Sequence, residues 1–319
     1  MKILEEIRER AKNKDLTIVL PEANIDDRVK DACVKILDEG LSKLIVFGKE
    51  NEFPKSMVSS SNCTIIDIEI SDLKDMFAKQ LYELRKEKGL TIEEANNLIK
   101  VPTYFAMMLL KNNMADGVVA GAKYSTADVL RPGLQIIKTK PGKKIVTGGM
   151  LMLKEDKEPL FFGDVSLIEN PSSEELSEIA IANAEFMEKV VNVKPKVAML
   201  SYSTKGSAKH VMVDKVRIAT ELAQNRGYII DGEMQVDSAL DVATAKKKGI
   251  TSEVGGQANV LVFPDLNAGN IGYKLVARLG EYVAVGPIML NFNKPINDLS
   301  RGCTVEEIIN TVLITKLLA

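Results

Sequence analysis

The sequence contains one histidine, His210, and this scarcity limits the chemistry available to the protein. A metal site built from several histidines is impossible, and a Ser-His-Asp triad would have to use that one residue. The apolar spacing from Ala208 onward predicts a helix, so a helix-surface or packing role competes with a catalytic one for His210. Proton transfer is therefore expected from a carboxylate, a lysine, a cysteine or a tyrosine.

Cysteines and long apolar runs are also few. Cys33, Cys63 and Cys303 are odd in number and form no CxxC pair, which argues against a disulfide framework and against structural zinc. The apolar stretch 145–153 is far shorter than the ~20 residues that span a bilayer. The charged, amphipathic segment 1–15 does not resemble a secretory signal. We expect a cytoplasmic protein with reduced thiols and no membrane partner.

The near-neutral charge and the absence of nucleotide-binding motifs exclude further classes of protein. The 42 basic and 44 acidic side chains give a net charge of −2, and no basic tail or aromatic stripe suggests nucleic-acid binding. The sequence has no GxxxxGK[ST], and no GxGxxG follows a predicted strand, so neither a P-loop nor a dinucleotide site is indicated. The length of 319 residues suggests about two domains, or one large α/β unit.

Apolar runs of strand length alternate with helical patterns along the chain. Helices are expected at 26–40 and at 172–191, the second opening with the capping box Ser172 to Glu175. This alternation predicts an α/β fold with a largely parallel sheet. The predicted strands are 17–21, 43–48, 64–68, 116–121, 144–153, 196–203, 228–233, 259–265 and 282–288.

Polar, glycine-bearing loops follow four of these strands, where open α/β sheets bind their ligands. Their hydroxyls and backbone N–H groups suit phosphate, although serine and threonine are equally ordinary helix caps. The loops are 121–133, 201–209, 231–239 and 264–274, and their candidate anion-binding residues are Ser125, Thr126, Ser201, Ser203, Thr204, Gly206 and Ser207.

Arginine is the side chain best suited to bidentate contact with phosphate or carboxyl oxygens. Four arginines are candidates, although an isolated arginine is more often a solvated surface charge. Arg131 and Arg301 are favoured because each lies beside a proline or glycine that restrains the backbone; the other two are Arg85 and Arg278.

The segment 293–312 resembles a solvent-facing turn that leads into a helix. Thr304 and Glu307 fit a capping box, so the helix is expected to begin near Thr304 and to hold an anion at its amino end. Glu307 then caps the helix and could also act as a general base. Cys303 raises the alternative of a covalent acyl-enzyme, against the simpler interpretation of a small buried residue, which we favour because no histidine is placed to activate the thiol.

Five motifs together resemble the phosphate acetyl/butaryl transferase family, and within it the bacterial members that transfer acetyl groups. The motifs lie at 117–139, 199–210, 231–240, 258–280 and 286–303, and the resemblance covers nearly the whole chain. It implies reversible acetyl transfer between coenzyme A and phosphate, with acetyl-CoA and acetyl phosphate as partners, no permanently bound cofactor and no metal. It also implies a homodimer of chains with two α/β domains, similar to isocitrate and isopropylmalate dehydrogenases.

The resemblance further implies the domain limits and the catalytic residues. Residues 1–148 plus 298–319 would form one α/β domain and 149–297 the other, with the active site in the cleft between them. Ser300 would hydrogen-bond the reacting group and Arg301 would stabilise negative charge. The family places an aspartate seven residues after the serine as the base, and this sequence has Glu307 there.

The extra methylene of Glu307 puts its role as base in doubt, because displacing a catalytic group by ~1 Å can cost on the order of a hundredfold in rate. Glu306 or a water molecule could share the role. The residues implied to bind coenzyme A or phosphate are Arg85, Arg131, Arg278, Ser125, Thr126, Ser203, Thr204, Gly206 and Asn270.

Two alternative functions remain open at this stage. A phosphate butyryltransferase would differ only in its acyl pocket. A silent acetyl-CoA-sensing module, like domains attached to malic enzymes, is disfavoured because the Ser300-Arg301 turn is intact and the chain carries no attached catalytic domain.

Overall fold

The computed structural model describes residues 2–319, which form two compact units. One unit is continuous, Gly142–Asn291, and the other combines Lys2–Pro141 with Phe292–Ala319. The two boundaries, 141/142 and 291/292, therefore lie seven and six residues before the predicted limits of 148/149 and 297/298. The shift has a structural reason, since residues 147 and 148 already belong to a strand of the continuous unit and residues 296 and 297 to a strand of the other.

The discontinuous unit is built on a five-stranded sheet in the order β11-β4-β1-β2-β3, and every neighbouring pair is parallel. Its inner strands are continuous apolar runs with buried side chains, as expected for a sheet covered on both faces. The strands are β1 (Thr17–Leu20), β2 (Lys43–Phe47), β3 (Cys63–Ile66), β4 (Gly117–Ala120) and β11 (Ile296–Asp298).

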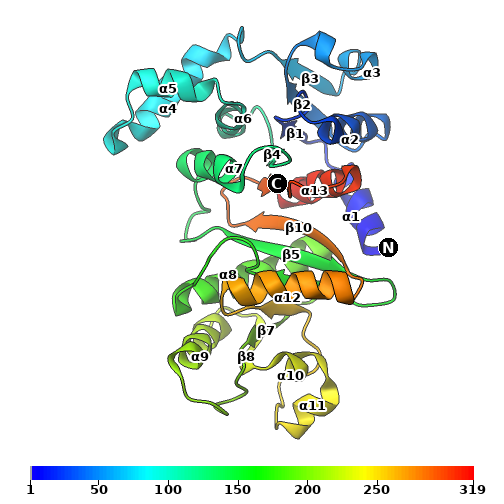
Figure 1. Cartoon of the computed structure of the whole chain (residues 1–319), viewed down its shortest axis with the longest axis vertical. Helices are drawn as coiled ribbons and strands as arrows, with labels where there is room; N and C mark the ends of the chain where they lie inside the picture. The colour runs from blue at the N-terminus through cyan, green and yellow to red at the C-terminus, as the bar shows by residue number, and fades with distance from the viewer. Residues whose placement is uncertain (1) are drawn as a thin grey trace. The chain divides into compact units, whose positions relative to one another are not determined.

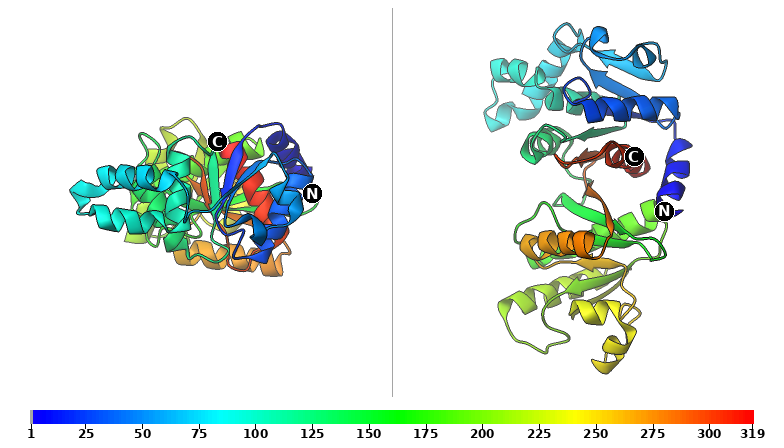
Figure 2. Two further views of the ribbon diagram at one scale, coloured as in Figure 1. Left: turned by 90° about the horizontal axis from the view of Figure 1, so that it is seen from above. Right: turned by 45° about the vertical axis from the view of Figure 1, so that its right-hand side comes forward.

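Residues 2–319 contribute eight α-helices to this unit. α13 lies beside α1 and α2, whereas α4 and α5 pack on each other and on α6 and project away from the sheet (Figures 1 and 2). The helices are α1 (Lys2–Lys12), α2 (Asp27–Asp38), α3 (Lys55–Val58), α4 (Leu73–Arg85), α5 (Ile92–Ile99), α6 (Pro102–Lys111), α7 (Thr126–Pro132) and α13 (Val305–Leu318). Short 3₁₀ turns lie at Glu50–Glu52 and Lys86–Lys88, and a π-helical turn, Gly133–Ile137, follows α7.

The continuous unit has a six-stranded sheet in the order β10-β5-β6-β9-β7-β8. β6, β9, β7 and β8 are parallel, whereas β5 runs antiparallel to both β10 and β6. The strands are β5 (Thr147–Leu153), β6 (Leu160–Gly163), β7 (Lys196–Leu200), β8 (Ile229–Met234), β9 (Val260–Val262) and β10 (Val283–Leu290).

Helices cover both faces of this second sheet (Figure 1). Phe162 faces a buried cluster that includes Tyr273 of α12, while Phe161 stacks on Phe186 of α8 with ring centroids 4.5 Å apart. Since neighbouring strand residues point to opposite faces, α12 and α8 lie on opposite sides. The helices are α8 (Ser173–Phe186) with its π-helical continuation Met187–Val191, α9 (Val211–Gln224), α10 (Val236–Leu240), α11 (Val242–Lys247) and α12 (Leu266–Leu279).

The predicted α/β class with largely parallel sheets is confirmed, and every predicted strand range overlaps an observed strand. Two strands were not predicted. β6 is a four-residue apolar run with no periodicity to distinguish it. β11 contains Asn297 and Asp298, residue types that are depleted in strands. The prediction of a solvent-facing turn at this point was wrong, because Asn297 and Asp298 are buried beside β4.

Candidate active site

Three chain segments meet at the carboxyl edge of the first sheet. β11, β4 and β1 are adjacent and parallel, so the residues that follow each of them emerge side by side. These segments are 299–303, 121–126 and 21–26. Two of them contain site residues predicted from the sequence, and the carboxyl edge of a parallel sheet is where such folds bind ligands.

Glu22, two residues beyond β1, organises the loop after β4. Its side chain is 1% exposed and accepts four backbone hydrogen bonds. Gly121 N and Ala122 N donate to Oε2 over 2.7 and 3.0 Å, and Lys123 N and Tyr124 N donate to Oε1 over 2.6 and 2.8 Å. This buried carboxylate therefore determines the path of the chain that leads to Ser125 and Thr126. Beside it, burial is the main factor that raises the pKa of Tyr124 to about 12.

Arg28 connects the turn after β11 to the same loop. Its Nη1 donates to the carbonyl oxygens of Arg301 and Cys303, each over 2.8 Å, and its Nη2 donates to Ala122 O over 3.3 Å. Asp26 holds the guanidinium from the other side, with Nε–Oδ1 at 3.1 Å and Nη2–Oδ2 at 2.7 Å. The hydrogen bonds from Arg28 lower the pKa of Asp26, so both groups are charged and the turn is fixed by a rigid pair.

Asp298 ends β11 and is 3% exposed. Its Oδ2 accepts a 2.6 Å hydrogen bond from the hydroxyl of Thr126, whereas its buried Oδ1 has no partner among residues 2–319. Gly121 makes room for this carboxyl, because a Cβ there would lie 2.3 Å from Oδ1. Burial is the main cause that raises the pKa of Asp298 to about 6, the Thr126 hydrogen bond opposes it, and the nearby charge of Glu22 adds to it.

Ser300 and Arg301 are exposed at the turn between β11 and α13. Ser300 Oγ accepts from Gly302 N over 3.3 Å, and no side-chain partner is recorded for the Arg301 guanidinium in the described part of the chain. The predicted capping box is confirmed: Thr304 Oγ1 accepts from Glu307 N over 3.3 Å, and Glu307 Oε2 accepts from Thr304 N over 2.7 Å. The Glu307 carboxylate is therefore already engaged at the start of the helix.

Cys303 is buried at the same turn. Burial raises the pKa of its thiol to about 11, and the charge of Arg28 only partly opposes this shift. A thiol with this pKa is a poor nucleophile near neutral pH, since the thiolate is the reactive form. The environment favours the small-buried-residue interpretation over an acyl-enzyme.

Three predicted arginines are near enough to Asp128 or Tyr104 to change the pKa values of these groups. The charges of both Arg131 and Arg301 lower the pKa of Asp128, after the larger effect of its hydrogen bonds from Ser125. The charges of Arg131 and Arg85 likewise oppose the burial that raises the pKa of Tyr104. Asp128 and Tyr104 thus connect Arg85, Arg131 and Arg301 into one series of neighbours.

Ser125 has a structural role that the sequence left open. It is the N-cap of α7, where its hydroxyl donates to Asp128 Oδ2 over 2.6 Å and accepts from Asp128 N over 3.2 Å. Thr126, the next residue, is exposed and turns its hydroxyl toward Asp298 instead. The two adjacent hydroxyls therefore donate hydrogen bonds to different carboxyl groups, Ser125 to Asp128 and Thr126 to Asp298.

In the continuous unit, a buried carboxylate holds the loop that follows β7. Glu233 Oε1 accepts from Ser203 Oγ over 2.9 Å and from Gly206 N over 2.7 Å. Thr204 Oγ1 accepts from Gln235 N over 3.1 Å. The polar groups predicted to bind an anion here form hydrogen bonds within the loop, so their binding role stays a prediction.

The remaining predicted residues of this unit lie on α12 and α9. Asn270 donates to Val165 O over 3.0 Å, and Arg278 is exposed in the last turn of α12. His210 is the N-cap of α9, with its Nδ1 accepting from Met212 N over 3.2 Å. The predicted helix therefore begins at Val211 rather than at Ala208, and its histidine is a cap.

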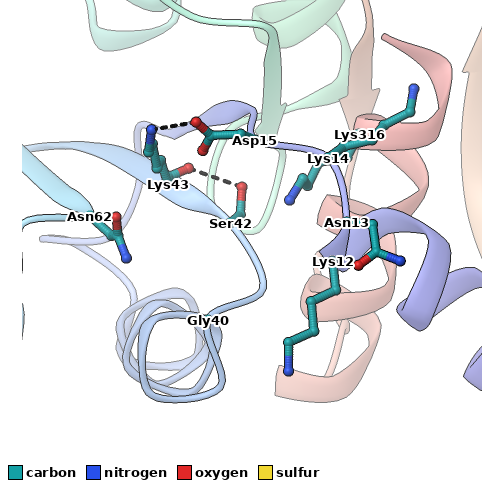
Figure 3. A pocket seen from close by; sticks show the side chains of 9 residues that line it. All are labelled: Lys12, Asn13, Lys14, Asp15, Gly40, Ser42, Lys43, Asn62 and Lys316. Carbon is teal, nitrogen blue, oxygen red and sulfur yellow. Dashed lines mark hydrogen bonds and ion pairs between the residues drawn. The ribbon is translucent and has the colours of Figure 1, made fainter.

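A small pocket of about 160 Å³ lies at the opposite, amino-terminal edge of the first sheet (Figure 3). Lys43 pairs there with Asp15 over 2.8 Å, and the buried ammonium of Lys316 donates to Leu41 O. The pocket is positively charged but contains none of the residues predicted from the sequence. No group of three or more metal-ligating side chains, and no helix able to cross a membrane, occurs among residues 2–319.

Glu22, Arg28 and Asp298 were not assigned site roles from the sequence. Glu22 follows the apolar strand β1, Arg28 lies in the first turn of α2, and Asp298 ends the polar strand β11. An acidic residue directly after a buried strand is a usable signal, because such a residue reaches the free N–H groups of neighbouring loops. The pairing of Arg28 with residues 301 and 303 has no local sequence signal.

These features describe an α/β protein in which charged and polar residues gather at the carboxyl edge of a parallel sheet, where such folds bind their ligands. The family model for phosphate acetyl/butaryl transferase matches residues 2–316, and the chain belongs to that family. It is 48% identical to the phosphate acetyltransferase of Clostridium acetobutylicum, covering 100% of this chain and 99% of that one. The Bacillus subtilis phosphate acetyltransferase is 42% identical over 97% of this chain and 96% of its own.

Solved structures agree with this assignment. A phosphotransacetylase from Streptococcus pyogenes has a TM-score of 0.93 at 42% identity, covering 99% of this chain and 97% of that one. A branched-chain phosphotransacylase from Enterococcus faecalis has a TM-score of 0.68 at 16% identity, and that likeness concerns the fold alone.

Proposed function

We propose that this chain is a phosphate acetyltransferase, which interconverts acetyl-CoA plus phosphate with coenzyme A plus acetyl phosphate. The observation that carries the proposal is the 48% identity to a phosphate acetyltransferase along the whole of both chains. The residues at the carboxyl edge of the first sheet are consistent with this activity. Three neighbouring arginines suit an acyl phosphate, and the Ser300-Arg301 turn is held by Arg28.

In the proposed mechanism, the thiolate of coenzyme A attacks the carbonyl carbon of acetyl phosphate. The C–S bond forms, the bond between carbon and the phosphate oxygen breaks, and the electron pair leaves with phosphate. Arg301 stabilises the developing negative charge, and Ser300 hydrogen-bonds the reacting group. Arg85 and Arg131 contact phosphate oxygens, while Arg278 and Asn270, with Ser203, Thr204 and Gly206, contact coenzyme A.

Glu307 is the base that the family resemblance assigns, and its Oε2 accepts hydrogen bonds from Thr304 N and Thr304 Oγ1. We also propose that the protein acts as a cytoplasmic homodimer, with no permanently bound cofactor. These assignments extend beyond the family identity and are tested separately.

The deciding experiment follows free thiol with purified protein, phosphate and acetyl-CoA, and in reverse with acetyl phosphate and coenzyme A. We expect turnover by the parent protein and a loss on the order of a hundredfold in kcat for Arg301→Ala. Arg217→Ala is the matched control, because Arg217 is an exposed arginine on α9 paired only with Asp214 and Glu221 in the described chain. Ser300→Ala and Glu307→Gln test the other two assignments.

Substituting butyryl-CoA for acetyl-CoA in the same assay tests the acyl preference, and faster turnover of butyryl-CoA would contradict the proposal. Binding of acetyl-CoA without turnover by the parent would instead identify a sensing module.

A further inference from the structure

The pairing of Asp298 with Thr126 has chemical consequences that extend beyond the family assignment. The carboxyl is 3% exposed, and no salt bridge to it occurs within residues 2–319. The one hydrogen bond recorded for it comes from Thr126, an exposed residue. The Thr126 hydroxyl therefore links a buried carboxyl to the surface beside the Ser300-Arg301 turn.

The direction of this hydrogen bond determines what Thr126 offers a ligand. A threonine hydroxyl has one proton, and while Asp298 is ionised that proton points to the carboxylate. Toward a ligand, Thr126 can then only accept. It suits a group that carries a proton, such as a thiol or the hydroxyl of hydrogen phosphate, and these are the two groups that must lose a proton to react in either direction.

We propose that Asp298, acting through Thr126, takes up the proton of the attacking nucleophile in both directions of the reaction. This inference rests on the proposed function and deepens it. The S–H bond of coenzyme A breaks as its proton passes to Thr126 Oγ1, whose own proton moves to Asp298 Oδ2. After attack on the acetyl carbon, the same two hydrogen bonds return one proton to the departing phosphate, so Asp298 is ionised again at the end of the cycle.

The surroundings of Asp298 support this role. Its second oxygen is buried and has no hydrogen-bond partner within residues 2–319, so the ionised form is poorly stabilised. Glu22, packed on the other side of Gly121, is the charged group that acts on it, and its negative charge also favours proton uptake. The pKa of about 6 lies close to neutral pH, where proton exchange is efficient. Glu307, by contrast, accepts two hydrogen bonds from Thr304.

The test is the dependence of kcat/KM on pH between pH 5 and 8, measured first for the parent protein. Because Asp298 must be ionised to accept a proton, activity should rise with pH through about 6. In Asp298→Asn this rise should vanish and kcat should fall on the order of a hundredfold, with acetyl-CoA binding unchanged. Asp116→Asn, at the other end of β4, is the control and should behave like the parent.

Thr126 variants keep the test decisive if Asp298→Asn does not fold. Thr126→Val should reproduce the loss, Thr126→Ser should restore most of the activity, and combining Thr126→Val with Asp298→Asn should add little further loss. The inference is overturned if the pH rise persists in Asp298→Asn and disappears in Glu307→Gln. A parent without turnover would instead overturn the proposed function, and this inference with it.

Discussion

At the scale of single residues, the buried carboxyl groups of this site differ in how well their charges are stabilised. Asp26 faces the Arg28 guanidinium, and its pKa is lowered by those hydrogen bonds. The Asp298 carboxyl accepts a hydrogen bond from the Thr126 hydroxyl, and burial raises its pKa to about 6. Two aspartates at the edge of one sheet thus differ in proton affinity, because Asp26 has a cationic partner and Asp298 has none within residues 2–319.

Asp298 should make the stability of the protein depend on pH in a predictable direction. Its pKa is higher in the folded than in the unfolded state, so the folded form binds the proton more tightly and stability falls as pH rises from about 4 to about 6. The shift from 3.8 to about 6 corresponds to about 3 kcal/mol.

Asp298→Asn should therefore stabilise the protein relative to the parent at pH 7 but not at pH 4. Thermal unfolding of both proteins across this range measures the difference. A difference between their Tm values that does not change with pH would show that folding does not raise the pKa of Asp298.

At the scale of elements, three carboxylates at strand ends hold loops by accepting backbone N–H groups. Glu22 follows β1, Asp164 follows β6 and Glu233 lies in β8. Each is buried, and each accepts from at least one N–H of a loop at the carboxyl edge of its sheet. A loop held in this way keeps its shape without forming regular secondary structure.

Glu22→Gln should be strongly destabilising, because an amide has one accepting oxygen and turns an NH₂ group toward N–H donors. We expect a loss of about 3 kcal/mol in the free energy of unfolding. Glu175→Gln is the matched control: Glu175 Oε2 accepts from Ser172 N over 2.8 Å in an exposed capping box, where glutamine is equally acceptable. Urea unfolding measures both, and equal losses would refute the anchoring role of Glu22.

At the scale of the whole molecule, one unit is formed by a single continuous segment and the other by two segments that are far apart in the sequence. The continuous unit, Gly142–Asn291, contains its own buried cluster, which includes Met152, Phe162 and Leu261. The other unit needs both ends of the chain, because β11 and α13 complete its sheet and core.

A protein consisting of residues 142–291 should fold by itself, since its size and core are those of an independent domain. Circular dichroism should show α/β structure and a cooperative thermal transition. It should have no transferase activity, because Ser300 and Arg301 are absent. A fragment without a cooperative transition would show that the unit depends on the rest of the chain.

The sequence by itself determined the class of fold and much of the local structure. Hydrophobic periodicity and apolar runs are local properties of a sequence. Nine strand positions and the capping boxes at Ser172 and Thr304 were therefore predictable from neighbouring residues. The five motifs together indicated the family, which the full-length match to residues 2–316 bears out.

Only the tertiary structure decided which polar residues act together. Thr126 and Asp298 are 172 positions apart in the chain, and Arg28 reaches the carbonyl of a residue 273 positions away. These contacts exist because β1, β4 and β11 are neighbours in a parallel sheet, an order that no local pattern encodes. The burial that changes the pKa values of Asp298 and Cys303 has the same origin. Proton affinity depends on solvent exclusion and on facing charges, and packing alone establishes both.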